Sequence, residues 1–392
     1  HCIYSNFDIF RILNMTIAHE VAEITGHFQM PGDYISHRPC GNGHINDTFV
    51  AAFSQGGNRV RYIVQRINQL VFKQPEIVMD NIIRVTTHLA DKMRSANEPE
   101  LHRRVLTLIP CRNGNLWHCD DAGNHWRAYI YIEGASAHDH VDSPVLAREA
   151  ARSFGGFQKA LVDLPGPRLR DTIPNFHNAR VRFNTFREAV NNDAAGRVAP
   201  CQQDIDWIME REEIVDVLLD LHKRGDLPER ITHNDTKINN VMIDNVSGEG
   251  ICIMDLDTVM PGFALYDFGD LIRTTTISCA EDEQDLSRVH MRLPLYEALV
   301  SGYLSSAGDF LNDCEKEHLG FSGKLITFTI GMRFLTDHLN GDTYFKIHRP
   351  NHNLDRFRVQ AKMVESIEYQ EDAMIDALEH AASPRRKHAV RV

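Results

Sequence analysis

Ile231-Thr232-His233-Asn234-Asp235-Thr236-Lys237-Ile238-Asn239-Asn240-Val241-Met242-Ile243-Asp244 is the stretch of this chain that decides the predicted fold. It holds a histidine, an aspartate two residues later and an asparagine five residues after that, namely His233, Asp235 and Asn240. An apolar strand follows, then a turn containing glycine and a second apolar strand that ends at Asp255. Such a hairpin brings Asn240 and Asp255 close together without any long-range contact.

Phosphoryl transfer from ATP gives a chemical reason for this arrangement. Its transition state is loose, so a protein mainly positions the reactants and neutralises charge. Asp235 can accept the proton of an attacking hydroxyl, while Asn240 and Asp255 offer the hard oxygen atoms that Mg²⁺ prefers. Asp257 is expected on the same strand face as Asp255 and is a further candidate metal ligand. The alternative is an asparagine-rich surface loop next to a buried, hydrogen-bonded aspartate.

A second motif competes for the metal. Asp267-Phe268-Gly269 spells the metal-binding tripeptide of protein kinases, but it lies 32 residues after Asp235, whereas Asp255 lies 20 residues after it. The strand that ends at Asp255 is the one predicted to pair with the strand leaving the loop. We therefore assign the metal to Asp255 and expect Asp267 and Asp270 to brace the loop that follows them.

Working outward, the chain divides into a β-rich part and a helical part, which makes the predicted fold class α+β. Before residue 134, strands are predicted at residues 49–53, 62–65, 105–109 and 129–132, with one helix starting at Pro75. After it, a helix is predicted behind Ser143-Pro144, then a loop-rich stretch over 165–203, a helical stripe over 208–222 that ends at Gly225, and further helices past 290. The predicted domains are a leader (1–30), a small nucleotide-binding lobe (31–133), a larger catalytic and acceptor-binding lobe (134–382) and a basic tail (383–392).

Composition limits the classes of partner. The chain has 392 residues and a formal net charge of -12, which argues against binding to nucleic acid or to anionic membranes. Eight dispersed cysteines, none in a C-x-x-C pair, favour a reduced, cytoplasmic protein. No apolar run approaches the ~20 residues of a membrane span. The expected partner is a small-molecule substrate, and the sequence does not indicate an oligomeric state.

The motifs also resemble a known superfamily. His233–Asn240, Asp255–Thr258 and Tyr266–Asp270 are similar to the corresponding motifs of the aminoglycoside phosphotransferase and choline kinase superfamily, and the likeness extends over most of residues 31–370. Asp255–Gly262 and Arg333–Asp337 look like its N-acetylhexosamine 1-kinase branch. The resemblance implies a bilobal protein-kinase-like fold, ATP with Mg²⁺, and transfer to the anomeric hydroxyl of N-acetylglucosamine or N-acetylgalactosamine.

Nucleotide binding is assigned to three places. The backbone of Gly41, Gly43 and His44 can form an anion cradle, although a loop with two glycines is often only a turn. The strand lysine of protein kinases is missing, and Arg66 stands where it might be; a solvated charge on an edge strand is the alternative. Glu133 lies in a stretch that looks like the hinge between lobes, where backbone groups would meet adenine.

The acceptor is assigned to Arg333, Asp337 and Tyr344, which together offer hydroxyl partners and a stacking face for a sugar. Arg333 and Asp337 are four residues apart, so an ion pair within one helix is the alternative. His177, Asn178 and Arg180 are weaker candidates. Two other classes remain open: a kinase of the same fold that acts on choline, an aminoglycoside or another metabolite, and a nucleotide-binding protein without activity.

Overall fold

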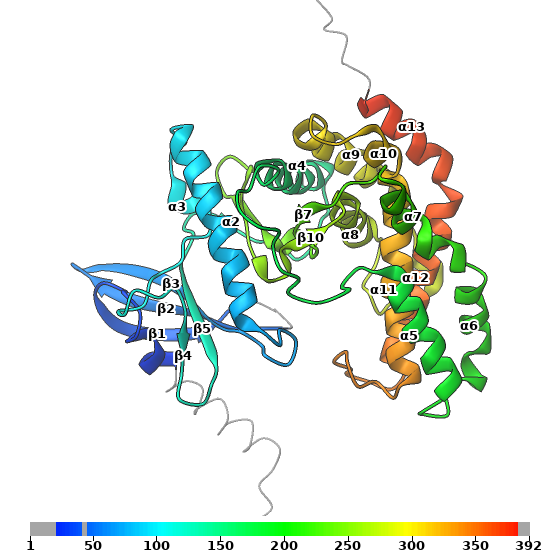
Figure 1. Cartoon of the computed structure of the whole chain (residues 1–392), viewed down its shortest axis with the longest axis horizontal. Coiled ribbons are helices and arrows are strands. Elements are labelled where there is room, and N and C mark those ends of the chain that lie inside the picture. The colour runs from blue at the N-terminus through cyan, green and yellow to red at the C-terminus, as the bar shows by residue number, and fades with distance from the viewer. Residues whose placement is uncertain (1–20, 41–44, 383–392) are drawn as a thin grey trace, which may run out of the picture. The chain divides into compact units, whose positions relative to one another are not determined.

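The computed structural model describes residues 21–40 and 45–382, whose elements are labelled in Figure 1. The chain forms two compact units: one runs to Ala135 and includes Arg170–Ile173, and the other comprises Ser136–Leu169 and the chain from Pro174 onward. We call them the N-terminal and C-terminal units. The predicted cradle residues Gly41, Gly43 and His44 and the tail 383–392 lie outside the described residues.

The N-terminal unit is built on an antiparallel sheet of order β1-β2-β3-β5-β4. Its strands are β1 (Asp33–Pro39), β2 (Asp47–Gln55), β3 (Asn58–Arg66), β4 (His118–Cys119) and β5 (His125–Ile130), with helices α2 (Pro75–Ser95) and α3 (Leu101–Arg104). The short strand β6 (Ala135–Ser136) lies where the chain passes into the C-terminal unit. Proline occupies the first turn of α2, as predicted. The predicted strand 105–109 is wrong: the segment makes only an isolated bridge, Leu108 to Tyr129, beside β5.

The two faces of this sheet have different neighbours. One face, which includes Tyr62, Val64 and Ala128, forms a buried core with Val21, Ile24, Phe28 and Met30. Residues 21–30 were expected to belong to a leader, and the structure places them in this core. On the other face, Arg127 of β5 lies against Met79 of α2, with 4.0 Å between its guanidinium nitrogen and the sulfur. Strand alternation therefore separates a packed face from a face that carries polar side chains.

Arg170–Ile173 joins the N-terminal unit through a buried side chain of α2. The Asn81 amide donates a hydrogen bond of 2.7 Å to the Arg170 carbonyl and accepts one of 3.4 Å from the Arg170 amide. A buried amide needs such partners, so this contact explains why a segment far along the chain returns to the first unit.

The C-terminal unit is mostly helical. Its helices are α4 (Pro144–Ala160), α5 (Ala179–Asn192), α6 (Gln202–Met209), α7 (Val217–Arg224), α8 (Ala264–Thr276), α9 (Leu293–Ala307), α10 (Asp313–Glu317), α11 (Leu319–Leu339), α12 (His352–Tyr369) and α13 (Glu371–Ala382). Short 3-10 helices are η1 (Ala199–Cys201), η2 (Glu212–Asp216), η3 (Ile238–Asn240), η4 (Leu256–Thr258) and η5 (Leu286–Arg288). Its strands are β7 (Arg230–Thr232), β8 (Val241–Asp244), β9 (Gly250–Ile253) and β10 (Met260–Gly262), with β8 antiparallel to β9 and β7 to β10.

Several predictions of elements in this unit can be compared with the structure. The hairpin after the central motif is confirmed as β8 and β9. Ser143 caps α4 by accepting hydrogen bonds from two backbone amides, and Gly225 ends α7 with a φ of 84°. The stretch 165–203 was expected to be loop-rich but contains α5, and the stripe 208–222 is broken into α6, η2 and α7.

Two glycines permit close packing of the helices that surround the hairpin. A Cβ on Gly302 of α9 would lie 2.1 Å from the Arg148 carbonyl of α4, and one on Gly269 of α8 would lie 2.4 Å from the Ser322 carbonyl of α11. Both helix pairs therefore require glycine at the contact. The glycine of the competing Asp267-Phe268-Gly269 motif thus serves helix packing.

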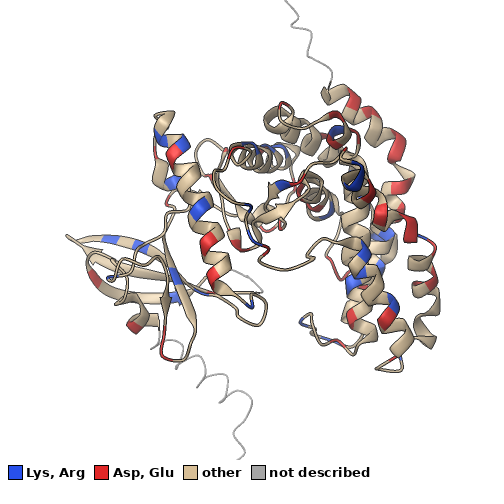
Figure 2. Cartoon of the chain, in the orientation of Figure 1, with Lys and Arg blue, Asp and Glu red and all other residues tan. Residues whose placement is uncertain are grey.

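The distribution of charged residues, the hydropathy of the helices and the state of the cysteines can be read from the described residues. Acidic and basic residues alternate along α2 and along the helices of the C-terminal unit (Figure 2). In the described part of the chain, no helix combines the length and the hydropathy needed to cross a bilayer. The seven cysteines in that part are all free thiols.

Candidate active site

The central motif forms a loop that leaves β7 and enters η3 and β8. Asn234 adopts a left-handed conformation with a φ of 66°, and its amide donates 2.9 Å to the Thr258 carbonyl. Thr232 donates to the Asn234 side-chain oxygen at 3.0 Å, and Thr258 donates to the His233 carbonyl at 2.7 Å. The loop is therefore tied to η4 by side chains whose polar atoms are buried and satisfied.

His233 connects the loop to the end of β9. Its Nδ1 accepts from the Asp235 backbone amide at 3.3 Å, so the ring proton lies on Nε2, which donates 2.8 Å to the Met254 carbonyl. The Met254 amide in turn donates 2.8 Å to the Asn240 carbonyl. This fully buried imidazole fixes the backbone of Asp235 and places Asp255, the next residue after Met254, beside Asn240.

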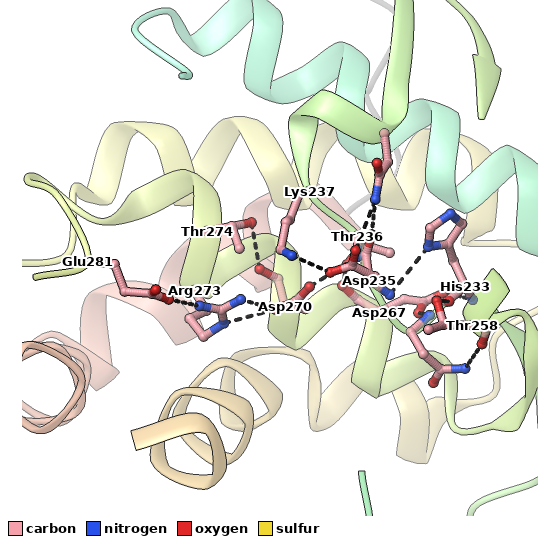
Figure 3. A network of polar contacts seen from close by, with 12 residues as sticks. His233, Asp235, Thr236, Lys237, Thr258, Asp267, Asp270, Arg273, Thr274 and Glu281 are labelled. Atoms are coloured by element: carbon pink, nitrogen blue, oxygen red, sulfur yellow. Dashed lines mark hydrogen bonds and ion pairs between the residues drawn. The ribbon is translucent and has the colours of Figure 1, made fainter. Parts of the chain in front are cut away.

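Asp235 lies between a cation and an amide, as Figure 3 shows for its contact with Lys237. The Lys237 ammonium is 2.7 Å from Oδ1, and the Asn240 amide donates 3.2 Å to Oδ2 and 2.8 Å to the Asp235 carbonyl. Burial would raise the pKa of Asp235, but the positive charges of Lys237 and Arg273 outweigh it and hold the pKa below its usual value. The carboxylate is ionised at neutral pH and partly open to solvent, which suits a proton acceptor.

Asp267 and Asp270, in the first two turns of α8, brace the loop from below (Figure 3). Asp267 accepts from the backbone amides of His233 at 2.9 Å and Asn234 at 2.7 Å, and from the Gln158 amide at 2.6 Å. Asp270 accepts from the Thr236 amide at 3.0 Å. The prediction that these aspartates brace the loop following them was wrong: they hold the loop that precedes them by about 30 residues.

Burial determines the pKa of Asp267. Its side chain is fully buried, and burial raises the pKa to about 6 against the opposing effect of His233 and the hydrogen bonds it accepts. Asp270 is also paired with Arg273, whose Nη2 lies 2.8 Å from Oδ1. All oxygens of this pair thus face protein donors, which gives both aspartates a positioning role.

Asn240 and Asp255 present the right atoms for Mg²⁺. The Asn240 amide nitrogen is committed to Asp235, which leaves its side-chain oxygen as the available ligand atom. Asp255 is exposed and has a φ of 54°, a conformation that aspartate adopts more readily than most residues. An amide oxygen and one carboxylate, completed by water and phosphate, form a typical magnesium donor set.

Asp257 does not share a strand face with Asp255, contrary to the prediction. β9 ends at Ile253, and Asp257 lies in the 3-10 helix η4, where it is 2% exposed. Among the described residues, no group of three His, Cys, Asp or Glu side chains is arranged to hold a metal ion.

Arg66 lies on the packed face of the N-terminal sheet. It shares its side of β3 with Tyr62 and Val64 and contacts Asp47, with Nη2 2.7 Å from Oδ2. Strand alternation places Arg61 and Gln65 on the opposite face, where Gln65 accepts two hydrogen bonds from the buried Arg127. A cation for phosphate on that opposite face would therefore come from another arginine.

Glu133 forms part of a cavity in the N-terminal unit. The cavity has a volume of about 550 Å³ and is lined by Ser36, His37, Arg38, Val50, Ala52, Arg59, Arg61 and Glu133. Arg61 pairs with the Glu133 carboxylate and lies over the Tyr131 ring at 3.9 Å. Arg103 donates 3.0 Å to the Glu133 carbonyl. The predicted hinge residue is thus held by two arginines beside a polar cavity.

Arg333 and Tyr344 come together, as predicted for the acceptor site. The Arg333 guanidinium lies 5.7 Å from the centre of the Tyr344 ring and 5.5 Å from that of Phe345. Burial, the neighbouring Arg182 and the more distant Arg273 lower the pKa of Arg333 to about 10. Tyr344 is exposed on the loop after α11, so its ring can contact a bound molecule.

Asp337 does not pair with Arg333 and is not available to a sugar. Its Oδ1 accepts from the amides of Thr343 and Tyr344 at 2.9 and 2.8 Å. Its Oδ2 accepts from the Phe345 amide and the Asn353 side chain, both at 2.9 Å. The structure therefore gives Asp337 a positioning role: it shapes the loop that carries the aromatic rings around Arg333.

The weaker candidates separate into two kinds. Arg180 pairs with Glu212 and Asp216, and Asn178 caps α5, so both are structural. His177 is buried and donates 3.0 Å to the Asn234 carbonyl of the central loop. Burial lowers the pKa of His177 to about 4, so this imidazole is neutral at physiological pH.

Sequence reasoning missed Lys237 and Arg182. Lys237 stands inside the motif, two residues from Asp235, and its position was the available signal. Arg182 was hidden because α5 was assigned to a loop-rich stretch, and only the fold brings it beside Arg333.

A known enzyme family matches much of this chain. The model of the phosphotransferase enzyme family, APH, matches residues 36–299, more than half of the chain. An aminoglycoside phosphotransferase from Alicyclobacillus acidocaldarius has a TM-score of 0.55 at 12% identity, covering 91% of this chain and 95% of that one. A spectinomycin phosphotransferase in complex with ADP and spectinomycin has a TM-score of 0.55 at 14% identity, with 91% and 98% covered.

A choline kinase from Cryptosporidium parvum is similar as well, with a TM-score of 0.53 at 15% identity, covering 92% of this chain and 98% of that one. At such low identity these likenesses show the fold alone. They confirm the predicted α+β protein-kinase-like fold, with an antiparallel sheet followed by a mostly helical part.

Proposed function

The chain belongs to the phosphotransferase enzyme family, and from this premise and the geometry of the central loop we propose that it is a kinase of small molecules that uses ATP. The observation that carries the proposal is the carboxylate of Asp235, kept ionised by Lys237 and oriented by Asn240. In this proposal, Asp235 accepts the proton of the acceptor hydroxyl as that oxygen bonds to the γ-phosphorus and the bond to the ADP oxygen breaks.

Asn240 and Asp255 would hold Mg²⁺ through the side-chain oxygen atoms described above. When bound, the ion neutralises charge on the phosphates. Asp235 is oriented from two sides, by its backbone contact with His233 and by the Asn240 amide. Asp267 and Asp270 keep the loop backbone in place, so the proton acceptor does not need to reorganise during transfer.

For the nucleotide we propose the polar face of the N-terminal sheet. Its cavity of about 550 Å³ is large enough for a nucleoside, and Arg38, Arg59 and Arg61 line it. The guanidinium groups of Arg38 and Arg59 can bind phosphate oxygens in a bidentate manner, whereas Arg61 pairs with Glu133. The predicted cradle residues Gly41, Gly43 and His44, which follow β1 in the sequence, remain part of the proposal. The spectinomycin phosphotransferase named above contains ADP, which supports a nucleotide as cosubstrate.

For the acceptor we propose the anomeric hydroxyl of N-acetylglucosamine or N-acetylgalactosamine, so that the product is the sugar 1-phosphate. Two observations support a sugar. The segments Asp255–Gly262 and Arg333–Asp337 resemble the N-acetylhexosamine 1-kinase branch, and Arg333 lies beside the exposed ring of Tyr344. The anomeric hydroxyl is more acidic than the other sugar hydroxyls. An ordinary ionised aspartate without a partner base, such as Asp235, can therefore accept its proton.

Phosphorus NMR of the product tests the proposal. The full chain with ATP and Mg²⁺ is incubated separately with each N-acetylhexosamine, with choline and with kanamycin. We expect an anomeric phosphate signal from the hexosamines only, and no product from 1-O-methyl glycosides. Asp235→Asn, the matched control, should retain nucleotide binding but lose about 10²–10⁴ in turnover.

Two outcomes would contradict parts of the proposal separately. A phosphate on another hydroxyl, or faster turnover of choline or kanamycin, would remove the sugar 1-kinase while leaving the kinase intact. Normal turnover by Asp235→Asn at saturating ATP and acceptor would remove Asp235 from its role.

A further inference from the structure

Arg333 is a cation without an anionic neighbour. Its guanidinium lies among the rings of Phe176, Tyr344 and Phe345, at 5.5 to 5.7 Å from each centre. Within the described residues it makes no ion pair, in contrast to Arg273, which pairs with Asp270 and Glu281. Burying a guanidinium without a carboxylate costs free energy that the aromatic faces offset only in part.

A second arginine shares this environment. Arg182 of α5 donates from Nη2 and Nε to the Phe176 carbonyl, at 3.1 and 3.4 Å, and like Arg333 makes no ion pair within the described residues. Burial lowers the pKa of Arg182 as well. Arg180, two residues earlier on the same helix, has two carboxylate partners. Arg182 therefore differs from its neighbour on the helix in having no carboxylate partner.

The arginine pair is connected to the central loop through one dipeptide. Phe176 contacts both arginines, one through its carbonyl and one through its ring. The next residue, His177, donates 3.0 Å to the carbonyl of Asn234, the residue before Asp235. Both arginines thus contact Phe176, and the residue after it contacts the loop that holds the proposed base.

From this geometry we propose that Arg182 and Arg333 bind oxygen atoms of the acceptor and act as a charge filter that rejects acceptors carrying an ammonium group. The proposal deepens the function above and rests on it. Guanidinium groups donate to hydroxyl, carbonyl or acidic oxygens in a fixed geometry. Two like charges without a carboxylate repel a third, and such repulsion discriminates between partners. Pockets that bind choline instead surround the quaternary ammonium with aromatic faces.

The charge filter predicts that the enzyme discriminates against acceptors with an ammonium group, and this discrimination can be measured as a ratio of kcat/KM values. N-acetylglucosamine and glucosamine share one ring and differ at the nitrogen, which is a neutral amide in the first and a titratable amine in the second. The ratio of their kcat/KM values should rise in favour of glucosamine as the pH increases and the ammonium loses its proton. We expect a rise of about 10- to 100-fold, the range for one charge facing two partly buried cations.

Variants identify the arginines as the cause. Arg182→Gln and Arg333→Gln should each reduce this pH-dependent rise about 10-fold, because one of the repelling charges is gone. Arg182→Lys retains a charge and should preserve the rise. Arg180→Gln, the matched control on the same helix, should preserve it too. An equal rise in the wild-type chain and both glutamine variants would overturn the proposal, as would a ratio that does not change with pH.

A binding measurement tests the filter independently of turnover. Sulfate, as an oxygen-rich anion, should raise the melting temperature of the wild-type chain more than that of Arg182→Gln or Arg333→Gln, each compared with chloride at equal ionic strength. Equal shifts in all three proteins would overturn the charge filter. If no hexosamine is phosphorylated while the sulfate difference is present, the sugar proposal fails and the arginine pair stands.

Discussion

Lys237 controls the proton affinity of Asp235, the residue on which the proposed chemistry depends. Its ammonium lies 2.7 Å from the carboxylate, and it is the main charge that opposes the effect of burial on the pKa of Asp235. Lys237→Met should therefore raise this pKa and move the acidic limb of the pH profile of kcat upward by about one unit, or ~1.4 kcal/mol. The profile is measured from pH 4 to 9.

Lys237→Arg provides the control, because it retains the cation and should leave the limb near its wild-type position. An unchanged limb in Lys237→Met would show that the lysine does not set the protonation of Asp235, whatever it does to the rate.

The position of a site residue can be predicted from the sequence when its contacts are with residues close to it in the chain. Asp235, Asn240 and Asp255 could be predicted because one loop and one hairpin bring them together. The face of β3 on which Arg66 lies could be inferred from its alternation with Tyr62 and Val64, whereas its contact with Asp47 could not. Arg182, in contrast, meets Arg333 only through packing of α5 and α11, about 150 residues apart, which no local pattern encodes.

Among the elements, the loop after α11 depends on Asp337 for its shape. Three backbone amides and the side chains of Thr343 and Asn353 donate to this carboxylate. Asp337→Asn replaces one carboxylate oxygen with an NH2 group, which cannot accept hydrogen bonds. We expect Tyr344 and Phe345 to lose their fixed position, so that the KM for the acceptor rises about 3- to 30-fold while the KM for ATP is unchanged.

Steady-state kinetics in both substrates measure this effect, with Asp309→Asn as a control at an exposed ion pair of the same unit. A lower melting temperature without a change in the acceptor KM would show that the loop supports only the fold.

Of the elements themselves, capped helices and the hairpin were predictable, since their signals lie within a few residues. Helix α5 was not, because Pro, Asn and Arg around it resemble a loop.

For the whole molecule, the buried Asp267 links stability to pH. Its pKa of about 6 in the folded state exceeds the ordinary 3.8, so the folded protein binds more protons than the unfolded chain between these values. The contribution of this group to the free energy of unfolding is therefore fully present below pH 4 and is lost as the pH rises through 6, by up to ~3 kcal/mol.

Urea unfolding at pH 4 and pH 7 measures this contribution, with Asp267→Asn as reference because the variant lacks the titrating group. The stability of the wild-type chain minus that of the variant should be greater at pH 4. An equal difference at both pH values would refute the linkage. The same protonation removes an acceptor from the central loop, so activity should fall under the acidic conditions that favour this part of the fold.

The contacts of α8 with the central loop also determine whether that loop can be transplanted. The backbone amides of His233, Asn234 and Thr236 find their acceptors on Asp267 and Asp270, not within the loop. Residues 231–244 grafted onto another scaffold would leave these three backbone donors without acceptors. Each unsatisfied donor would destabilise the grafted loop by about 1–3 kcal/mol where water cannot reach it. The graft would have to include α8, which supplies these acceptors, and Gly269, which lets α8 approach α11.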